Sequence, residues 1–170
     1  MDLLIDEIET QIGVMIIAAC NGTLHALEFK DTDRLNLQSL SRRFSLIRHN
    51  DPFGFSTAVK GYFEGDIKAL DNIPVVLEGT EFQQRVWLAL RDIPWGTTIS
   101  YGELAARVGS PKAFRAVGLT NGLNPISIVL PCHRVIGSDG SLTGYGGGLN
   151  RKEWLLRHEG VGSSQLSFLP

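Results

Sequence analysis

A cysteine and a histidine stand side by side in a setting that suits nucleophilic chemistry. Cys132, His133 and Arg134 follow an apolar run and precede a glycine-rich stretch. The thiolate is the reactive form of cysteine, so a nucleophilic thiol needs a base or a positive charge beside it. His133 and Arg134 are candidates for these roles, and a carboxylate such as Glu159 would orient the imidazole.

The spacing of this pair sets a geometric condition. Neighbouring side chains of an extended segment point to opposite faces, so Cys132 and His133 need a turn or a bridging water to act together. The pair alone leaves two interpretations of Cys132 open: a nucleophile or an inert buried cysteine.

The first 76 residues are predicted to form a small α+β unit. Apolar runs over residues 12–18 and 24–29 are joined through Asn21-Gly22. An Asn-Gly pair between two such runs predicts a β-hairpin, because both central residues of a type I′ turn need a positive φ.

Two helices are predicted after this hairpin. Asp33 is a candidate N-cap for the first helix, and the second starts at Asp51-Pro52 and stops at Gly65. Residues 73–77 are expected to form a strand or a connector, because the proline among them limits strand pairing.

Beyond residue 76 the pattern changes to short helices with strong N-terminal signals. Thr80 with Gln83, and Ser100 with Glu103, have the residue types of capping boxes. They predict two helices with a Pro-Trp-Gly break between them.

A third helix is predicted to begin at Ser110-Pro111 and to run to about Gly122, with proline at its first helical position. Two short helices separated by a turn at Gly109 form a helix-turn-helix pattern. Helix pairs with short links are common in α-rich proteins, so this pattern by itself leaves DNA binding open.

The remaining segments lead into and out of the cysteine. Residues 126–130 predict a buried extended run, and residues 137–148, with six glycines, predict a loop. Asn150 is expected to cap a final helix, and the last ten residues are expected to form a weakly ordered tail.

Composition excludes several classes of protein. The hydrophobic content of 43% and charged content of 20% are ordinary for a globular protein. The sequence contains no run of 18 apolar residues, so no membrane span is predicted. The acidic start lacks the features of a signal peptide. Two cysteines are too few for a disulfide framework, which predicts a reducing, cytoplasmic setting.

The charge is distributed unevenly along the chain. Residues 1–79 carry seven basic and twelve acidic residues, whereas residues 107–157 carry seven basic and two acidic ones. A locally basic half can contact phosphates even though the net charge of the whole chain is −2. A solvated surface is the plain alternative.

A wider set of motifs changes the interpretation of the cysteine. Residues 128–136, Ile-Val-Leu-Pro-Cys-His-Arg-Val-Ile, closely resemble the active-site signature of the O6-alkylguanine-DNA alkyltransferases. The resemblance covers most of residues 79–160, in the family's order and spacing. Its other segments are Phe82–Trp87, Ile99–Ala105, Arg115–Gly118, Asn124-Pro125, Gly144–Gly148, Lys152–Leu156 and His158–Gly160.

This resemblance implies a fold in two parts. Residues 1–76 would form a small ribonuclease-H-like α/β domain. Residues 77–160 would form a mostly α-helical domain with a winged helix-turn-helix and the active site, and residues 161–170 a tail. The fold class is therefore expected to be α+β.

The resemblance also implies direct reversal of DNA damage. A protein of this family flips the damaged base out of double-stranded DNA, because the alkyl carbon on guanine O6 is out of reach in the stacked duplex. Cys132 would take the alkyl group irreversibly from O6-alkylguanine, one turnover per molecule, and O4-alkylthymine stays open as a second substrate. The expected protein is a monomer that needs no cofactor and binds no membrane.

Roles for individual residues follow from their positions in the family pattern. His133 would act as base through a water, with Glu159 orienting it, and Tyr101 would hold or protonate the flipped guanine. In DNA binding, Arg115 would fill the gap left by the base and Asn124 would brace the helix-turn-helix. Tyr145, Gly146 and Lys152 would line the base pocket.

Some relatives carry a structural zinc in the N-terminal domain. Cys20 and His25 have a compatible spacing, but no further ligands accompany them, and a structural zinc site normally has four. No metal is predicted, and Cys20 is expected to lie in a strand core.

Three other functions fit the sequence less well than alkyl transfer does. A non-catalytic damage sensor would replace the nucleophile, commonly with tryptophan, which Cys132 argues against. A Cys-His hydrolase or thiol redox protein would not need Arg115, Asn124 or the paired capped helices. A plain helix-turn-helix regulator has no use for a Cys-His pair beside a glycine-rich loop.

Overall fold

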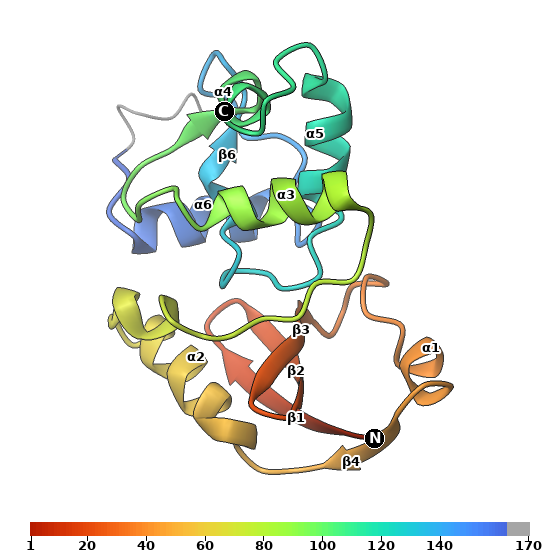
Figure 1. Cartoon of the computed structure of the whole chain (residues 1–170). Helices are drawn as coiled ribbons and strands as arrows, with labels where there is room; N and C mark the ends of the chain where they lie inside the picture. Colours follow the sequence, from red (N-terminus) through yellow and green to blue (C-terminus); the bar gives the residue numbers. More distant parts are fainter. Residues whose placement is uncertain (163–170) are drawn as a thin grey trace. The chain divides into compact units, whose positions relative to one another are not determined.

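The computed structural model describes residues 1–162 and divides into two compact units (Figure 1). The first unit holds Met1–Leu77 together with Pro125–Val129, and the second holds Glu78–Asn124 and the chain from Leu130 onward. The fold is mixed α/β, with a sheet in the first unit and mostly helices in the second. Every helix within residues 1–162 is too short or too polar to cross a membrane.

A four-stranded sheet in the order β3-β2-β1-β4 forms the first unit's core. Strands β1 (Asp2–Thr10), β2 (Gly13–Cys20) and β3 (Thr23–Phe29) pair antiparallel, and β4 (Ser45–Arg48) pairs parallel with β1. The hairpin prediction is confirmed for β2 and β3. Strands β1 and β4 were not predicted.

The turn between β2 and β3 has the expected backbone conformation. Asn21 has a φ of 50° and Gly22 a φ of 75°, the left-handed values that a type I′ turn requires. Cys20, at the end of β2, is buried in a core cluster with Leu3 and Ala18, as predicted.

The first helix of this unit begins later than predicted. The prediction of an N-cap at Asp33 is wrong: α1 (Leu37–Ser41) begins after Asn36, whose side chain accepts a hydrogen bond from the amide of Ser39. The helix ends at Ser41, and the chain then pairs with β1 from Ser45 onward.

The second helix of the first unit follows its prediction closely. A 3-10 turn (Pro52–Gly54) leads into α2 (Phe55–Phe63), and a further 3-10 turn spans Ile67–Leu70. Residues 73–77 form a connector, which makes a single bridge between Val75 and Leu24.

The second unit contains four helices and a two-stranded parallel sheet among its described residues. They are α3 (Glu81–Leu90), β5 (Ile99–Ser100), α4 (Tyr101–Arg107), α5 (Phe114–Gly122), β6 (Val135–Ile136) and α6 (Leu149–His158).

The two predicted capping boxes differ in completeness. Thr80 accepts from the amide of Gln83 at 3.1 Å, and the Gln83 side chain accepts from the amide of Thr80 at 3.0 Å, which confirms the first box. In the second, the Ser100 hydroxyl accepts from the amide of Glu103 at 3.1 Å. This cap makes Tyr101 the first residue of α4, directly after β5.

The predicted start of α5 is wrong. The amide of Ser110 donates to the carbonyl of Ala105, and the amide of Ala113 donates to the carbonyl of Ser110, so residues 110–113 form a turn. Pro111 lies within that turn, and α5 begins at Phe114. Its C-terminal end at Gly122 agrees with the prediction.

Two further predictions near the cysteine need correction. Residues 126–130 are buried but not extended throughout, because Ile128 has a φ of 71° and the amide of Val129 donates to the carbonyl of Ser127. The N-cap of α6 is Gly148, so Asn150 lies inside the helix instead of capping it.

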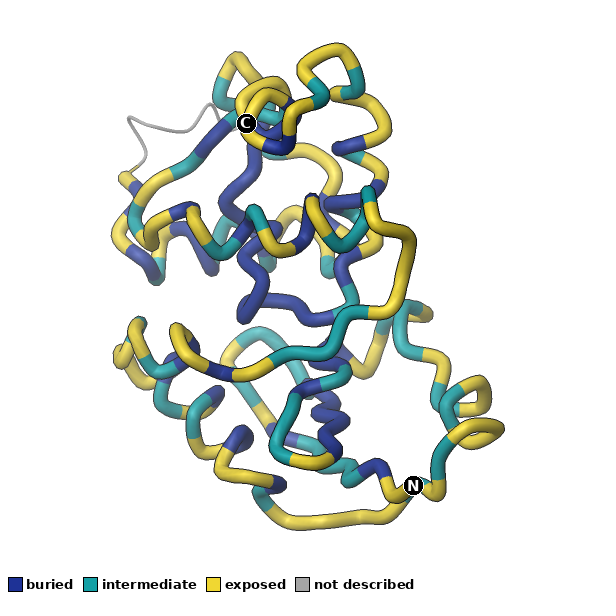
Figure 2. The backbone as a smooth tube through the Cα atoms, in the orientation of Figure 1, coloured by how far each residue is buried: buried dark blue, intermediate teal, exposed yellow. Residues whose placement is uncertain are grey.

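In the second unit, the segment 130–136 is buried at every residue, as the dark blue tube in Figure 2 shows. Residues 137–148 form the predicted loop. Most of the predicted tail, residues 163–170, lies outside the described residues.

Candidate active site

Cys132 lies in a tight turn within a buried segment of the second unit. Residues Cys132–Arg134 form a 3-10 turn that leads directly into β6. The amide of Cys132 donates to the carbonyl of Leu130 at 2.8 Å. This turn meets the geometric condition for the side chains of Cys132 and His133 to act together. Cys132 is 3% exposed, and neither it nor Cys20 forms a disulfide.

The imidazole of His133 is fixed by a carboxylate. Nε2 of His133 lies 2.7 Å from Oε1 of Glu159, and both side chains are fully buried. A carboxylate can only accept, so Nε2 carries the proton and donates. The other ring nitrogen, Nδ1, is then the acceptor, and it has no hydrogen-bond partner among the described residues. Nδ1 of His133 is therefore a basic nitrogen that can accept a proton.

Arg134 holds the same carboxylate from another side. Its Nε and Nη2 donate to the two oxygens of Glu159 at 2.8 and 2.9 Å, and its Nη1 donates to the carbonyl of Ile93. The sequence left the role of Arg134 undecided. In the structure its guanidinium forms a two-point ion pair that fixes Glu159.

The pKa values of the His133–Glu159 pair move in directions that suit a neutral base. Burial lowers the pKa of His133, against the opposing charge and hydrogen bond of Glu159. Burial by itself would raise the pKa of Glu159, but the charges and hydrogen bonds of His133 and Arg134 hold that pKa well below its ordinary value. Because a guanidinium is always charged, Arg134 keeps Glu159 ionised while His133 is neutral.

Lys152 is a fully buried cation on α6. Its ammonium donates to the carbonyls of Val135 and Thr143 at 2.6 and 2.7 Å. Burial lowers the pKa of Lys152 to about 8, against the opposing electrostatic effect of Cys132. The ammonium is therefore within electrostatic range of the thiol, where it favours a thiolate.

Tyr101 reaches the same region from the start of α4. Its hydroxyl donates to the carbonyl of Thr143 at 2.8 Å, and the ammonium of Lys152 lies 5.8 Å from its ring centroid. Burial raises the pKa of Tyr101, and Cys132 raises it further. The phenol therefore keeps its proton at neutral pH.

Two buried asparagines hold the backbone of the cysteine segment. Nδ2 of Asn124 donates to the carbonyl of Leu130 at 2.6 Å, and Nδ2 of Asn121 donates to the carbonyl of Cys132 at 3.3 Å. The sequence drew attention to Asn124 and missed Asn121. The available signal was its position four residues after Val117, on the buried face of α5.

The other predicted site residues lie at the edges of this cluster or outside it. Tyr145 is buried in the loop, whereas its neighbour Gly146 is exposed. Arg115 is exposed near the start of α5, with its guanidinium 6.0 Å from the ring centroid of Phe114.

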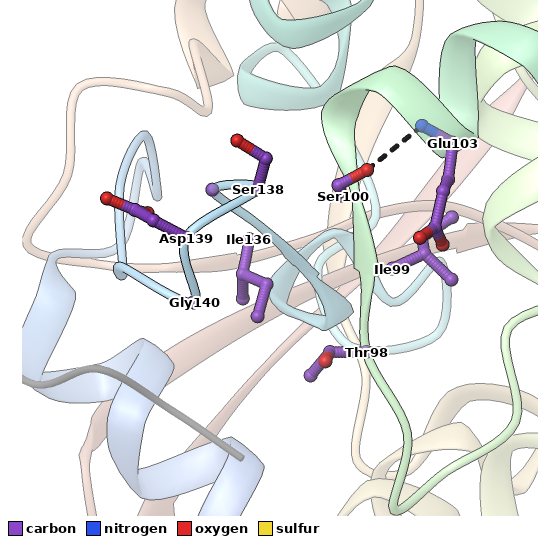
Figure 3. Close-up of a pocket in the computed structure, with 9 residues that line it drawn as sticks. Thr98, Ile99, Ser100, Glu103, Ile136, Ser138, Asp139 and Gly140 are labelled. Atoms are coloured by element: carbon purple, nitrogen blue, oxygen red, sulfur yellow. Dashed lines mark hydrogen bonds between the residues drawn. The ribbon is translucent and has the colours of Figure 1, made fainter.

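An open pocket of about 300 Å³ lies beside the sheet of the second unit (Figure 3). Its lining comes from β5, the start of α4, and β6 with the loop that follows, and it includes Glu103, Ser138 and Asp139. No predicted site residue lines it, so this pocket is distinct from the cysteine site.

The potential metal ligands of the described residues do not cluster. Within residues 1–162, no three His, Cys, Asp or Glu side chains are grouped as ligands of a metal ion would be. His25 packs edge-on against Phe44, with ring centroids 5.7 Å apart.

The chain is similar to proteins with known activities. Residues 81–161 match the family described as 6-O-methylguanine DNA methyltransferase, DNA binding domain. The methylated-DNA–protein-cysteine methyltransferase of Salmonella typhimurium is 46% identical over 164 residues, which cover 93% of this chain and 96% of that protein. The protein of the same name from Mycobacterium tuberculosis is 53% identical over 158 residues, 89% of each chain.

Solved structures agree with this match. The crystal structure of M. tuberculosis O6-methylguanine methyltransferase superimposes with a TM-score of 0.79 at 41% identity, covering 92% of each chain. The M. tuberculosis OGT in complex with DNA gives a TM-score of 0.78 at 40% identity, covering 98% of this chain and 95% of that one. This chain belongs to the methylated-DNA–protein-cysteine methyltransferase family.

Proposed function

We propose that this protein repairs DNA by moving the alkyl group of O6-alkylguanine onto Sγ of its own Cys132. The observation that carries the proposal is the buried His133–Glu159 pair beside Cys132, with the basic Nδ1 of the imidazole available. The relatives' names state transfer of a methyl group from DNA to a protein cysteine. Cys132 and His133 lie together in the 3-10 turn Cys132–Arg134.

The chemistry begins with the thiol. A water relays the proton of Cys132 to Nδ1 of His133, and the resulting imidazolium is stabilised by the ionised Glu159. Lys152 favours the thiolate from its buried position. Sγ then attacks the alkyl carbon, so that an S–C bond forms as the C–O6 bond breaks.

The departing guanine needs a proton to leave as a neutral base. Tyr101 holds the base or donates its phenolic proton to it. The raised pKa of Tyr101 supports this role, because the proton stays on the oxygen until the leaving group demands it. The thioether at Cys132 has no route back, so each molecule acts once and no cofactor is required.

DNA is the proposed partner, as double-stranded DNA that contains alkylated bases. The likeness to a relative solved in complex with DNA supports this proposal. Helices α4 and α5 would act as a winged helix-turn-helix in the minor groove, with Arg115 filling the gap left by the flipped base. Between Glu103 and Asp139 the sequence has four basic and no acidic residues, which favours contact with phosphates.

The remaining roles follow the family pattern. Asn124 would brace the helix-turn-helix against the cysteine segment, and its hydrogen bond to Leu130 supports this role. Tyr145, Gly146 and Lys152 would line the base pocket. Glycines there let the backbone approach the base closely.

The proposed organisation is a ribonuclease-H-like domain over residues 1–76, a helix-turn-helix and active-site domain over residues 77–160, and a tail over residues 161–170. We expect a monomer that works in the cytoplasm. Incubation with excess duplex DNA that contains O6-methylguanine labelled in its methyl group tests the proposed function. We expect one labelled methyl group per protein molecule, and none on the Cys132→Ala variant.

A further inference from the structure

A buried amide contacts the backbone of the nucleophile. Asn121 is 1% exposed on the inner face of α5. Its Nδ2 donates to the carbonyl of Cys132 at 3.3 Å. The amide of Asn121 also lies close enough to the phenol to lower the pKa of Tyr101, against the larger raising effect of burial. Asn121 therefore lies beside the backbone of Cys132 and the side chain of Tyr101, two residues that the proposed reaction uses.

The orientation of this amide is fixed by its partner. The carbonyl oxygen of Cys132 can only accept, so the NH₂ group of Asn121 must face it. Oδ1 of Asn121 is left pointing elsewhere, and this buried oxygen has no hydrogen-bond partner among the described residues. Buried polar atoms of this kind are few in native proteins, and each one calls for an explanation.

The chemistry of the substrate supplies a matching donor. Once O6 of guanine is alkylated, N1 carries no proton, and N9 is bonded to the sugar. The exocyclic 2-amino group is then the only N–H donor of the base. This group is bonded to C2, on the edge of the ring that also carries N1 and O6, and O6 must face Cys132.

We infer that Oδ1 of Asn121 accepts a hydrogen bond from the 2-amino group of the flipped guanine, and that Asn121 thereby selects guanine lesions over thymine lesions. This inference rests on the proposed function. O4-alkylthymine has no N–H donor, so it leaves the buried oxygen unpaired. A site built to bind an N–H group rejects analogues that lack it.

Single-turnover methyl transfer from three duplexes tests the inference. They carry O6-methylguanine, O6-methylhypoxanthine, which differs only by lacking the 2-amino group, or O4-methylthymine. The wild type is expected to react about tenfold faster with O6-methylguanine than with O6-methylhypoxanthine. In Asn121→Leu that ratio is expected to fall to about one, beyond any loss of rate that both substrates share because the bond to the carbonyl of Cys132 is also removed.

Thr120→Val is the matched control. Thr120 is the buried neighbour of Asn121 on the same helix, and the substitution preserves its shape, so the wild-type ratio is expected to persist. The rate at which iodoacetamide modifies Cys132 reports whether the folded site of Asn121→Leu is intact.

The possible outcomes separate the inference from the proposed function. Equal wild-type rates on the two purines, or an unchanged ratio in Asn121→Leu, would overturn the role of Asn121. No transfer by the wild type from O6-methylguanine would overturn the proposed function itself.

Discussion

Tyr101 and Lys152 donate hydrogen bonds to the same atom, the carbonyl oxygen of Thr143, at 2.8 and 2.7 Å. One residue comes from the start of α4 and the other from α6. Their meeting point lies in the glycine-rich loop, whose glycines give its backbone little restraint of their own. A phenol and a buried ammonium therefore hold this loop in place near Cys132.

The buried ammonium gives the first prediction. The pKa of Lys152 is about 8 in the folded protein and 10.5 for an ordinary lysine. Between these values the unfolded chain binds more protons, so the contribution of Lys152 makes the free energy of unfolding rise with pH. Urea denaturation from pH 7.5 to 10.5 should show a rise of about 1–3 kcal/mol in the wild type relative to Lys152→Met.

Lys68→Met is the control, because Lys68 is exposed. The free energy of unfolding of Lys68→Met should change with pH in the same way as that of the wild type across this range. A Lys152→Met protein that shows the same pH dependence as the wild type would contradict the lowered pKa of Lys152.

The second prediction concerns the ion pair at Glu159. In Glu159→Gln the buried guanidinium of Arg134 loses its counter-charge, so the free energy of unfolding should fall by about 3 kcal/mol at pH 7. The folded pKa of Glu159 lies below the unfolded one, so its contribution is present above about pH 4.5 and is lost as the pH falls through the folded pKa. Chemical denaturation at pH 7 measures the first effect, and a series from pH 5 down to the lowest pH at which the protein stays folded measures the second.

Glu153→Gln is the matched control, on the helix α6 whose C-cap is Glu159. Glu153 pairs with Arg157 at 3.0 Å, and both side chains are partly exposed. The expected loss is below about 0.5 kcal/mol. Equal losses in the two variants would mean that burial adds nothing to the Glu159 pair.

The third prediction is a pH profile for alkyl transfer. His133 acts as a base only when neutral, and burial lowers its pKa below 6.5. The transfer rate should therefore keep its plateau as the pH falls to 6.5 and decline only at lower pH. His133→Asn should lower the plateau about 100-fold or more. His49→Gln, at an exposed histidine, should leave the profile unchanged.

A rate that already halves at pH 7 would indicate a raised pKa for His133, contrary to the effect of its burial. Single-turnover measurements on O6-methylguanine DNA over pH 5 to 8 distinguish the two cases.

The fourth prediction separates DNA handling from chemistry. Arg115→Ala should slow transfer from duplex DNA about tenfold or more, because the gap left by the flipped base is no longer filled. Transfer from free O6-benzylguanine, which needs no flipping, should keep its rate. Arg85→Ala is the control, since Arg85 makes a similar exposed contact with the ring of Phe82. Equal slowing on both substrates would remove Arg115 from DNA binding.

The sequence predicted the elements whose signals are local. The Asn21-Gly22 turn and the Thr80–Gln83 capping box depend on side chains a few residues apart, and both are present. Strand β4 depends on pairing with β1, a contact between Ser45–Arg48 and the start of the chain that no local pattern reveals. The predicted start of α5 was wrong because Pro111 suits a turn as well as a first helical position.

The same division applies to the site. Cys132, His133 and Glu159 were singled out from the motif pattern, and the structure brings their segments together. Asn121 and the buried state of Lys152 could not be found in this way, because an asparagine or lysine on a helix is ordinarily exposed. Only the tertiary packing shows that these polar groups point inward.

The most direct test of the account is the intact mass of the protein after reaction with excess duplex DNA that contains one O6-methylguanine, followed by peptide mapping. The account predicts a stoichiometric gain of one methylene, located on Cys132, and no gain in Cys132→Ala. An unchanged mass in the wild type, or a methyl group located on another residue, would contradict it.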